Sequence, residues 1–196
     1  MKYYAFNALL ARMKYIARWG LMRSSRTESL SEHTADAAIL AHTLCLVSVG
    51  LFGADVRPET VAVAALYHDA GEILTGDMPT PVKYKNDALR TAYKSLEKSA
   101  AASLAELLPD ALQREMHAYL CAEQLSEKEA QLLKAADRLS ALIKCIDEEQ
   151  SGNREFAGAK QQQSAALHAM QCPEAEYFIE HMLPCYAWTL DELSQY

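Results

Sequence analysis

Apolar residues recur along this chain at the spacing of amphipathic helices, and no segment shows the strict alternation that indicates a half-buried strand. Residues 3–16 are predicted to form a first helix, whereas residues 17–28 show no sustained period and are predicted to form a loop. Ser29 and Glu32 stand at the spacing of a capping box, so a helix is expected to start there and to run to about Val49. Its expected buried stripe consists of Ala35, Ala38, Ile39, His42, Leu46 and Val49.

The next helix is expected to begin at Pro58, because proline suits the first position of a helix. Between Val61 and His68 its apolar residues are spaced as i, i+3, i+4 and i+7, which is the pattern of one buried face. The pattern fades before residues 76–81, whose two prolines exclude a continuous helix there. His68 and Asp69 are therefore expected to end an otherwise apolar helix.

The second half of the chain also has helical periodicity. Ser126 and Glu129 form a second capping-box match. Pro184 is expected to kink or split the final aromatic helix. The further helices are predicted over residues 86–108, from there to about Cys121, from Ser126 to about Glu149, and over residues 154–170 and 173–193.

The composition favours an all-α fold. Seven Gly and six Pro among 196 residues are few, and a hydrophobic content of 51% is enough for one substantial core. The abundance of Ala, Leu, Glu and Lys favours helices over a sheet. We expect a single domain over residues 1–196, built as a bundle of about seven or eight helices with no sheet.

Charge, cysteine usage and apolar runs limit the partners and the location of the protein. The net charge of −7 argues against broad binding to polymeric nucleic acid, although positive residues are concentrated between Arg12 and Arg26. No uninterrupted apolar run reaches the roughly 18 to 20 residues that cross a bilayer, and the N-terminus lacks the layout of a signal peptide. The five cysteines are widely spaced, which is typical of reduced thiols. We expect a cytoplasmic protein with no membrane partner.

Four ionisable residues interrupt otherwise apolar helix faces, namely His33, His68, Asp69 and Asp137. Burying such groups without a partner is unfavourable, and a divalent cation best suits imidazoles that lie beside carboxylates. Two neutral imidazoles and two carboxylates suit Mn, Co, Fe, Ni or Zn, and they leave coordination positions open for water and substrate. Asp36, which follows His33 by about one turn, is a candidate hydrogen-bond partner for that ligand.

The order His…His-Asp…Asp of these four residues resembles the HD-domain metal-dependent phosphohydrolases. A longer motif is more specific. The run from His68 to Tyr84, together with Arg18-Trp19 and Ser31-Glu32-His33, resembles the bacterial HD-domain 5′-deoxynucleotidases. This family removes the phosphate from deoxyribonucleoside monophosphates. The resemblance extends over nearly the whole chain.

The resemblance implies a metal centre. By it, His33, His68, Asp69 and Asp137 bind one divalent ion, such as Co or Mn. HD phosphodiesterases with two metals have further histidines between the HD pair and the final aspartate. Only His117 lies in that interval here, which favours a single ion.

The resemblance also implies a reaction, the hydrolysis of deoxyribonucleoside 5′-monophosphates by a metal-bound water. Arg18 would orient the phosphate, because a guanidinium offers paired donors to two phosphate oxygens. Glu72 would act as general acid or base, and Asp77 could take the second of these roles. The implied substrate contacts are Arg18, Trp19, His33, Asp77, Met78, Pro79, Thr80 and Asp137.

Two other functions stay open from the sequence. One is an HD phosphohydrolase acting on another nucleotide phosphoester, and the other is a metal-stabilised binding module without catalysis. The resemblance implies a homodimer. An aromatic C-terminal helix is a candidate contact, although core packing accounts for its residues equally well. These aromatic residues are Tyr177, Phe178, Tyr186 and Trp188.

Overall fold

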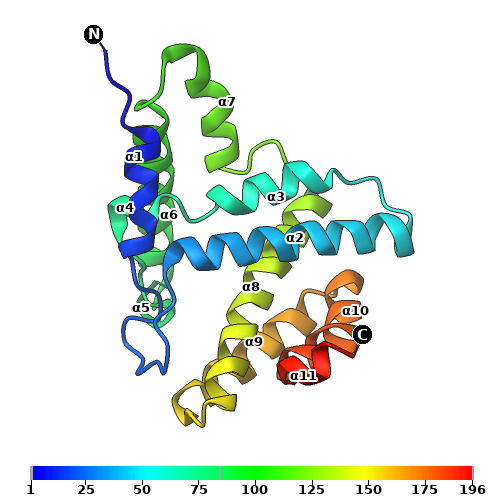
Figure 1. The fold of residues 1–196 in the computed structure, drawn as a ribbon. Coiled ribbons are helices and arrows are strands. Elements are labelled where there is room, and N and C mark those ends of the chain that lie inside the picture. Colours follow the sequence, from blue (N-terminus) through cyan, green and yellow to red (C-terminus); the bar gives the residue numbers. More distant parts are fainter. Residues whose placement is uncertain (1, 84, 196) are drawn as a thin grey trace.

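The computed structural model describes residues 2–83 and 85–195, apart from the side chains of Thr80 and Pro81. Within these residues every regular element is helical, and extended pairing is limited to one isolated bridge between Ala17 and Ser29. The all-α prediction is confirmed. The helices of Figure 1 are α1 (Phe6–Leu10), α2 (Leu30–Phe52), α3 (Pro58–Tyr67), α4 (Glu72–Thr75), α5 (Thr80–Lys83), α6 (Asp87–Ala105), α7 (Asp110–Leu120), α8 (Glu127–Gln150), α9 (Ala157–Ala169), α10 (Pro173–His181) and α11 (Leu190–Leu193). Short 3₁₀ helices span Ala11–Tyr15, Arg154–Phe156 and Leu183–Ala187.

Helices α2, α3 and α8 form the centre of the molecule. Helix α3 runs along α2, and α8 crosses both of them (Figure 1). Leu44, Val61, Leu132 and Leu139 are fully buried where these helices meet. Full burial of one such side chain stabilises the fold by about 1.5 to 3 kcal/mol, so this crossing is a major source of stability.

Both predicted capping boxes are present. Ser29 Oγ accepts a hydrogen bond from the backbone N–H of Glu32, and the Glu32 carboxylate accepts one from the backbone N–H of Ser29. Ser126 and Glu129 make the same reciprocal pair at the start of α8. An N-cap of this kind stabilises its helix by about 1 kcal/mol. These caps determine where the two longest helices begin.

The predicted buried stripe of α2 is largely wrong. Ile39, Leu46 and Val49 are 66%, 52% and 45% exposed, because α2 turns a different face toward α3 and α8. Helix α2 is apolar on nearly all sides, so periodicity could not identify the face that packs. Ala38 of the predicted stripe is buried, and the other buried residues of α2 are Leu30, His33, Thr34, Ala37, Leu40, Ala41, Leu44, Cys45, Val47 and Ser48.

Helix α2 is also long and apolar enough, by length and composition, to cross a membrane. The sequence prediction that no such segment exists considered only uninterrupted apolar runs. In the structure 44% of the most apolar window of α2 is buried inside the protein, against α3 and α8. The helix therefore serves as a core element of this fold.

The predicted helix over residues 58–76 is divided into two. Helix α3 ends at Tyr67, and hydrogen bonds of the i to i+3 type run through the turn that follows, from Ala70 N–H to Tyr67 and from Glu72 N–H to Asp69. A new short helix, α4, begins at Glu72. His68 and Asp69 consequently lie in a tight turn and not on a regular helix, which changes the direction in which Asp69 points.

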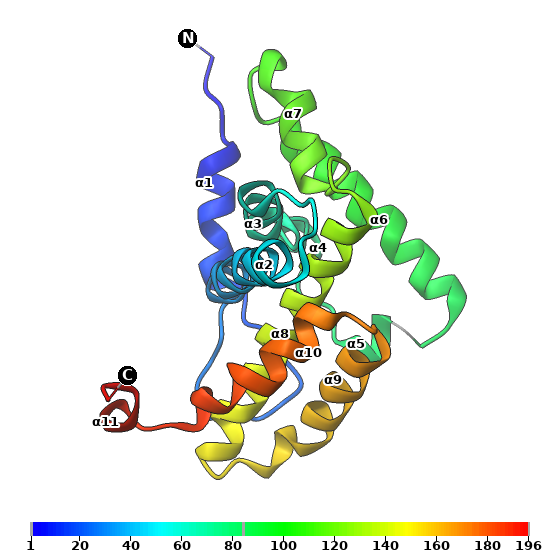
Figure 2. The same ribbon diagram turned by 90° about the vertical axis from the view of Figure 1, so that its right-hand side faces the viewer.

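The outer helices cover two sides of the centre. Helices α1, α6 and α7 enclose a second apolar cluster that contains Phe6, Ala70, Leu104 and Leu120. Helices α9 and α10 lie against α8 (Figure 2), and Lys128 in the first turn of α8 contacts Glu174 of α10. The chain leaves α10 at His181, just before Pro184, as the sequence predicts. Helix α11 then projects away from the rest of the molecule (Figure 2).

Candidate metal and active site

The four residues predicted as metal ligands come from three separate segments and lie together. His33 is in the first turn of α2, His68 and Asp69 are in the turn after α3, and Asp137 is in the middle of α8. His33 Nε2 lies 3.5 Å from Asp69 Oδ2 and 3.4 Å from Asp137 Oδ1. His68 Nε2 lies 3.2 Å and 3.9 Å from the same two oxygens.

Three of these four distances suit one divalent ion, and the 3.9 Å distance between His68 Nε2 and Asp137 Oδ1 is longer. Ligand atoms that each lie about 2.1 Å from an ion are separated from one another by about 3.0 to 3.5 Å at octahedral or tetrahedral angles. The Nε2 atoms of His33 and His68 are both buried and have no hydrogen-bond partner among the described residues. Two buried nitrogens without partners that face two carboxylates make a donor set of the kind that binds transition metals.

The other ring nitrogen of each histidine is held by the protein. His68 Nδ1 lies 2.7 Å from the carbonyl oxygen of Ala65 and must donate to it, because a carbonyl only accepts. His33 Nδ1 lies 3.0 Å from Ser140 Oγ. These contacts direct both Nε2 atoms toward the carboxylates, which is the usual support for a histidine ligand. Asp36 does not take this role, and the expectation that it supports His33 is wrong.

The electrostatics of the cluster point the same way. Burial disfavours a charged His68, but Asp69 and Asp137 outweigh burial and hold the pKa of His68 well above its usual value. Burial likewise opposes ionisation of the two carboxyl groups. The nearby imidazoles outweigh it, so the pKa values of Asp69 and Asp137 lie well below their usual values. A cluster that attracts positive charge this strongly suits a cation in place of the His68 proton.

Glu72 is a buried carboxyl group beside this cluster. It is 7% exposed, and in the part of the chain that the structure describes its Oε2 atom has no hydrogen-bond partner. Burial, followed by the negative charges of Asp69 and Asp77, raises the pKa of Glu72 to about 8. A carboxyl group with a pKa near neutrality suits proton transfer, and such perturbed groups concentrate at functional sites.

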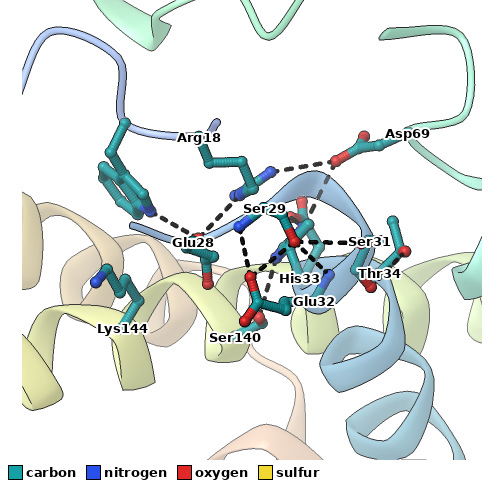
Figure 3. Close-up of polar contacts among 12 residues, drawn as sticks. Arg18, Glu28, Ser29, Ser31, Glu32, His33, Thr34, Asp69, Ser140 and Lys144 are labelled. Carbon is teal, nitrogen blue, oxygen red and sulfur yellow. Dashed lines mark hydrogen bonds and ion pairs between the residues drawn. The ribbon is translucent and has the colours of Figure 1, made fainter. Parts of the chain in front are cut away.

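Arg18 and Trp19 extend the site from the loop before α2. The Arg18 guanidinium lies between two carboxylates, with Nε 3.1 Å from Glu28 Oε2 and Nη1 3.4 Å from Asp69 Oδ2 (Figure 3). Burial opposes the charge of Arg18, but Asp69 and Glu28 outweigh it and raise the pKa of Arg18 further. The guanidinium is therefore a permanent cation beside the cluster of two histidines and two aspartates.

Trp19 has an unusual backbone conformation. Its φ angle is +60°, in the left-handed region that bulky residues avoid at a penalty of about 1 to 3 kcal/mol. The indole N–H donates to Glu28 Oε2 at 2.9 Å, and the ring packs edge-on against Phe156 with centroids 5.3 Å apart. These contacts stabilise the strained turn.

The segment over residues 77–80 connects α4 to α5 near the cluster. Asp77, Met78 and Pro79 are half-buried. The charge of Asp77 raises the pKa values of both Glu72 and Arg18, so this carboxylate faces the same region. The Thr80 side chain and the whole of Tyr84 lie outside the described residues.

Two residues of this region were not predicted. Ser140 supports His33, and its position one turn after Asp137 on α8 was a usable signal. Glu28 contacts both Arg18 and Trp19. It occurs in an irregular loop, where no periodicity marks a residue that turns inward.

Comparison with known proteins identifies relatives along the full chain. A family model described as 5′-deoxynucleotidase YfbR-like matches residues 5–186. The 5′-deoxynucleotidase of Vibrio vulnificus is 44% identical over 189 residues, which cover 96% of this chain and 97% of the relative. The 5′-deoxynucleotidase YfbR of Escherichia coli is 43% identical over 195 residues, which cover 100% of this chain and 98% of the relative.

Solved structures with the same fold are also available. An HD-domain phosphohydrolase from Listeria innocua has a TM-score of 0.81 at 24% identity, over 92% of this chain and 87% of that one. The HD phosphohydrolase DatZ of cyanophage S-2L, solved with dA and one catalytic Zn²⁺ ion, has a TM-score of 0.66 at 17% identity, over 90% of this chain and 95% of that one. The fold is thus that of HD phosphohydrolases, and by its sequence the chain belongs to the YfbR-like family of 5′-deoxynucleotidases.

Proposed function

We propose that the protein is a metal-dependent phosphomonoesterase that hydrolyses deoxyribonucleoside 5′-monophosphates to deoxynucleoside and phosphate. The observation that carries the proposal is the meeting of two unpartnered imidazole nitrogens and two carboxylates beside a buried Glu72, in a chain of this family. The names of its relatives as 5′-deoxynucleotidases support the same substrate class.

The ion would be held by His33, His68, Asp69 and Asp137, and we propose Co or Mn as the metal used. When bound, a divalent ion neutralises charge on the phosphoryl oxygens and lowers the pKa of water. The homologous fold of DatZ contains a catalytic Zn²⁺, which supports a transition metal at the equivalent place. A site with one ion fits the single cluster of two histidines and two aspartates.

Arg18 would bind the phosphate. Its guanidinium is a fixed cation held between Glu28 and Asp69, and a planar guanidinium matches two phosphoryl oxygens at once. Neutralising the dianion and orienting it for in-line attack is the main task in phosphoryl transfer. We propose this orientation as the catalytic role of Arg18.

Glu72 would move the proton. Its raised pKa allows the carboxyl group to hold a proton near neutral pH and to give it to the 5′-oxygen of the departing deoxynucleoside. The carboxylate form would accept a proton from the attacking water. Asp77, which faces the same region, is the candidate for the second of these two roles.

The nucleoside would lie against Trp19 and the segment over residues 77–80. Trp19 offers a flat apolar surface to a sugar or base. Steric rejection of one hydroxyl group by a pocket is modest, so selection of deoxyribose needs shaped contacts from both segments. His33 and Asp137 would contact the phosphate in addition to the ion.

We propose that the protein acts as a homodimer of single-domain subunits in the cytoplasm. The exposed face of α2 supports this, because Ile39, Leu46 and Val49 form an apolar stripe and no charged residue occurs between Ile39 and Phe52. Two copies related by a twofold axis could bring these stripes together without burying like charges. Helix α11 projects away from the other helices, and its Leu190 is 78% exposed (Figure 2).

The function is tested by phosphate release after chelator treatment. We expect the dialysed protein to be inactive with dAMP, and Co or Mn to restore activity more than Mg does. AMP should be hydrolysed more slowly than dAMP. A protein that hydrolyses neither nucleotide with any of these metals is not a 5′-deoxynucleotidase, and one that hydrolyses both equally has no deoxyribose selection.

A further inference from the structure

One carboxylate joins the two side chains to which the proposed function assigns phosphate and nucleoside binding. Glu28 Oε2 accepts a hydrogen bond from Arg18 Nε at 3.1 Å and another from Trp19 Nε1 at 2.9 Å. The Glu28 and Arg18 side chains are only 11% and 12% exposed. Hydrogen bonds to a carboxylate are stronger than neutral ones, particularly with little water present.

The backbone brings Glu28 to this position. The N–H of Arg18 donates to the carbonyl oxygen of Glu28 at 2.9 Å, and the N–H of Leu30 donates to Ile16 at 2.9 Å. Ala17 and Ser29 form a bridge between these two bonds. The start and the end of the loop are thus paired, and Glu28 faces Arg18 across this pairing (Figure 3). Glu28 also contacts the indole of Trp19.

The loop is held on α8 as well. The backbone N–H of Ser25 donates to Glu148 at 2.8 Å, and the buried Lys144 contacts both Glu148 and the carbonyl oxygen of Arg26. The segment that leads into Glu28 is therefore anchored to the same helix that carries Asp137. The position of the Glu28 carboxylate is determined relative to the metal cluster.

We propose that Glu28 is a positioning residue that holds the phosphate-binding Arg18 and the nucleoside-binding Trp19 in one fixed relation. This inference rests on the proposed function. Trp19 has a left-handed backbone angle, and its indole is held by the hydrogen bond to Glu28 and by its contact with Phe156. Loss of the carboxylate frees both side chains at once, although Glu28 itself touches no substrate.

The test compares Glu28→Gln with Asp36→Asn. Asp36 is a carboxylate that lines the same cavity as Glu28 but has no contact with Arg18 or Trp19 among the described residues. The measurements are kcat and KM with dAMP, and inhibition by the two products, inorganic phosphate and deoxyadenosine. Inhibition by phosphate measures binding at Arg18, and inhibition by deoxyadenosine measures binding at Trp19.

We expect Glu28→Gln to weaken inhibition by both products and to lower kcat/KM for dAMP by about 10- to 100-fold, because small misplacements of binding groups have large effects. Arg18→Ala should weaken inhibition by phosphate alone, and Trp19→Phe should weaken inhibition by deoxyadenosine alone. In the Arg18→Ala, Trp19→Phe background, Glu28→Gln should change kcat/KM by less than about 2-fold, because residues that act through one another are not additive. Asp36→Asn should resemble the wild type.

Several results would overturn the inference. If Glu28→Gln has the same kinetics and product inhibition as Asp36→Asn, Glu28 has no positioning role. An effect that persists undiminished without Arg18 and Trp19 indicates general structural damage. If Glu28→Gln does not fold, Glu28→Asp is tested in its place, because it retains the charge. Glu28→Asp must then still weaken inhibition by both products. A wild type that is inactive with dAMP overturns the proposed function itself, whereas an active wild type with an unaffected Glu28→Gln overturns this inference alone.

Discussion

The imidazole of His33 and the hydroxyl of Ser140 meet across the crossing of α2 and α8, with Nδ1 3.0 Å from Oγ. Both residues are buried. If His33 Nδ1 donates its proton to Ser140, Nε2 carries the lone pair that faces Asp69 and Asp137. The hydroxyl can accept this proton and so support the tautomer that suits a metal ligand.

Removal of this hydroxyl should weaken metal binding. We expect Ser140→Ala to reduce the affinity for Mn or Co by about 10- to 100-fold, since residues that orient a ligand have effects of this size. Ser48→Ala is a matched control. Ser48 is a buried serine like Ser140, but it lies on α2 and donates to Glu174 at 2.6 Å. Metal affinity by calorimetry decides the matter, and equal affinities for the two variants would contradict the role of Ser140.

Replacement of Glu72 should separate chemistry from metal binding. We expect Glu72→Gln to retain stoichiometric metal and to lose about 100- to 10,000-fold in kcat, which is the usual contribution of a general acid or base. The measurements are metal analysis and phosphate release on the same preparation. Loss of metal from this variant would mean that Glu72 is a ligand.

Metal binding should release protons and should strengthen with pH. The pKa of His68 lies well above its usual value, and that of Glu72 is about 8, so a cation that binds beside these groups competes with protons on both of them. A cation disfavours the protonated forms, and affinity should therefore rise between about pH 6 and pH 8. Calorimetry in buffers of different ionisation enthalpy counts the released protons. Glu72→Gln should release fewer protons on metal binding. A metal affinity that does not change with pH would refute the prediction.

Charges placed on the exposed stripe of α2 should separate the proposed dimer. We expect Leu46→Glu to weaken association by about 2 kcal/mol or more, because a charge at the centre of an apolar interface cannot be buried. Leu112→Glu is the control, since Leu112 is 48% exposed on α7 and away from this face. Sedimentation of both variants measures the effect. A monomeric wild type would contradict the proposal, and a dimeric Leu46→Glu would exclude this interface.

The contact between Glu129 and Arg57 should make stability depend on acid pH. Hydrogen bonds from Arg57 outweigh burial and lower the pKa of Glu129 to about 2. A lowered pKa stabilises the fold above the unfolded value of about 4.5 and loses this contribution as the pH falls toward 2. Arg57 is half-exposed, so we expect about 1 kcal/mol. The free energy of unfolding, measured with urea, should differ less between pH 6 and pH 3 for Glu129→Gln than for the wild type.

Local patterns in the chain were sufficient for most helix positions. The capping boxes at Ser29 and Ser126 and the proline at position 58 depend only on neighbouring residues, so they could be read directly. Pro184 likewise marked the place where the final aromatic helix is split. The recurrence of His33, His68, Asp69 and Asp137 on apolar segments was also visible, because a buried ionisable group is conspicuous wherever it occurs.

The face that each helix buries could not be obtained in this way for α2. Its apolar residues surround the whole helix, and only contact with α3 and α8 distinguishes Leu40 and Leu44, which are buried, from Ile39 and Leu46, which are exposed. The sequence placed His68 and Asp69 at the end of an apolar helix, but it did not predict that they lie in a tight turn before a new helix. A short break in a helix depends on what packs against it, and Ala70 is fully buried there.

The partners of the site residues depend on contacts between distant segments. Ser140 lies 107 residues after His33, and Glu28 belongs to a loop whose conformation comes from its anchoring on α8. No local pattern encodes a hydrogen bond across such separations, because it forms only when the core has brought the helices together. Residue type and spacing were enough to nominate an ion-binding group, whereas the direction of each ligand and the raised pKa of Glu72 arise from burial and from neighbours that folding supplies.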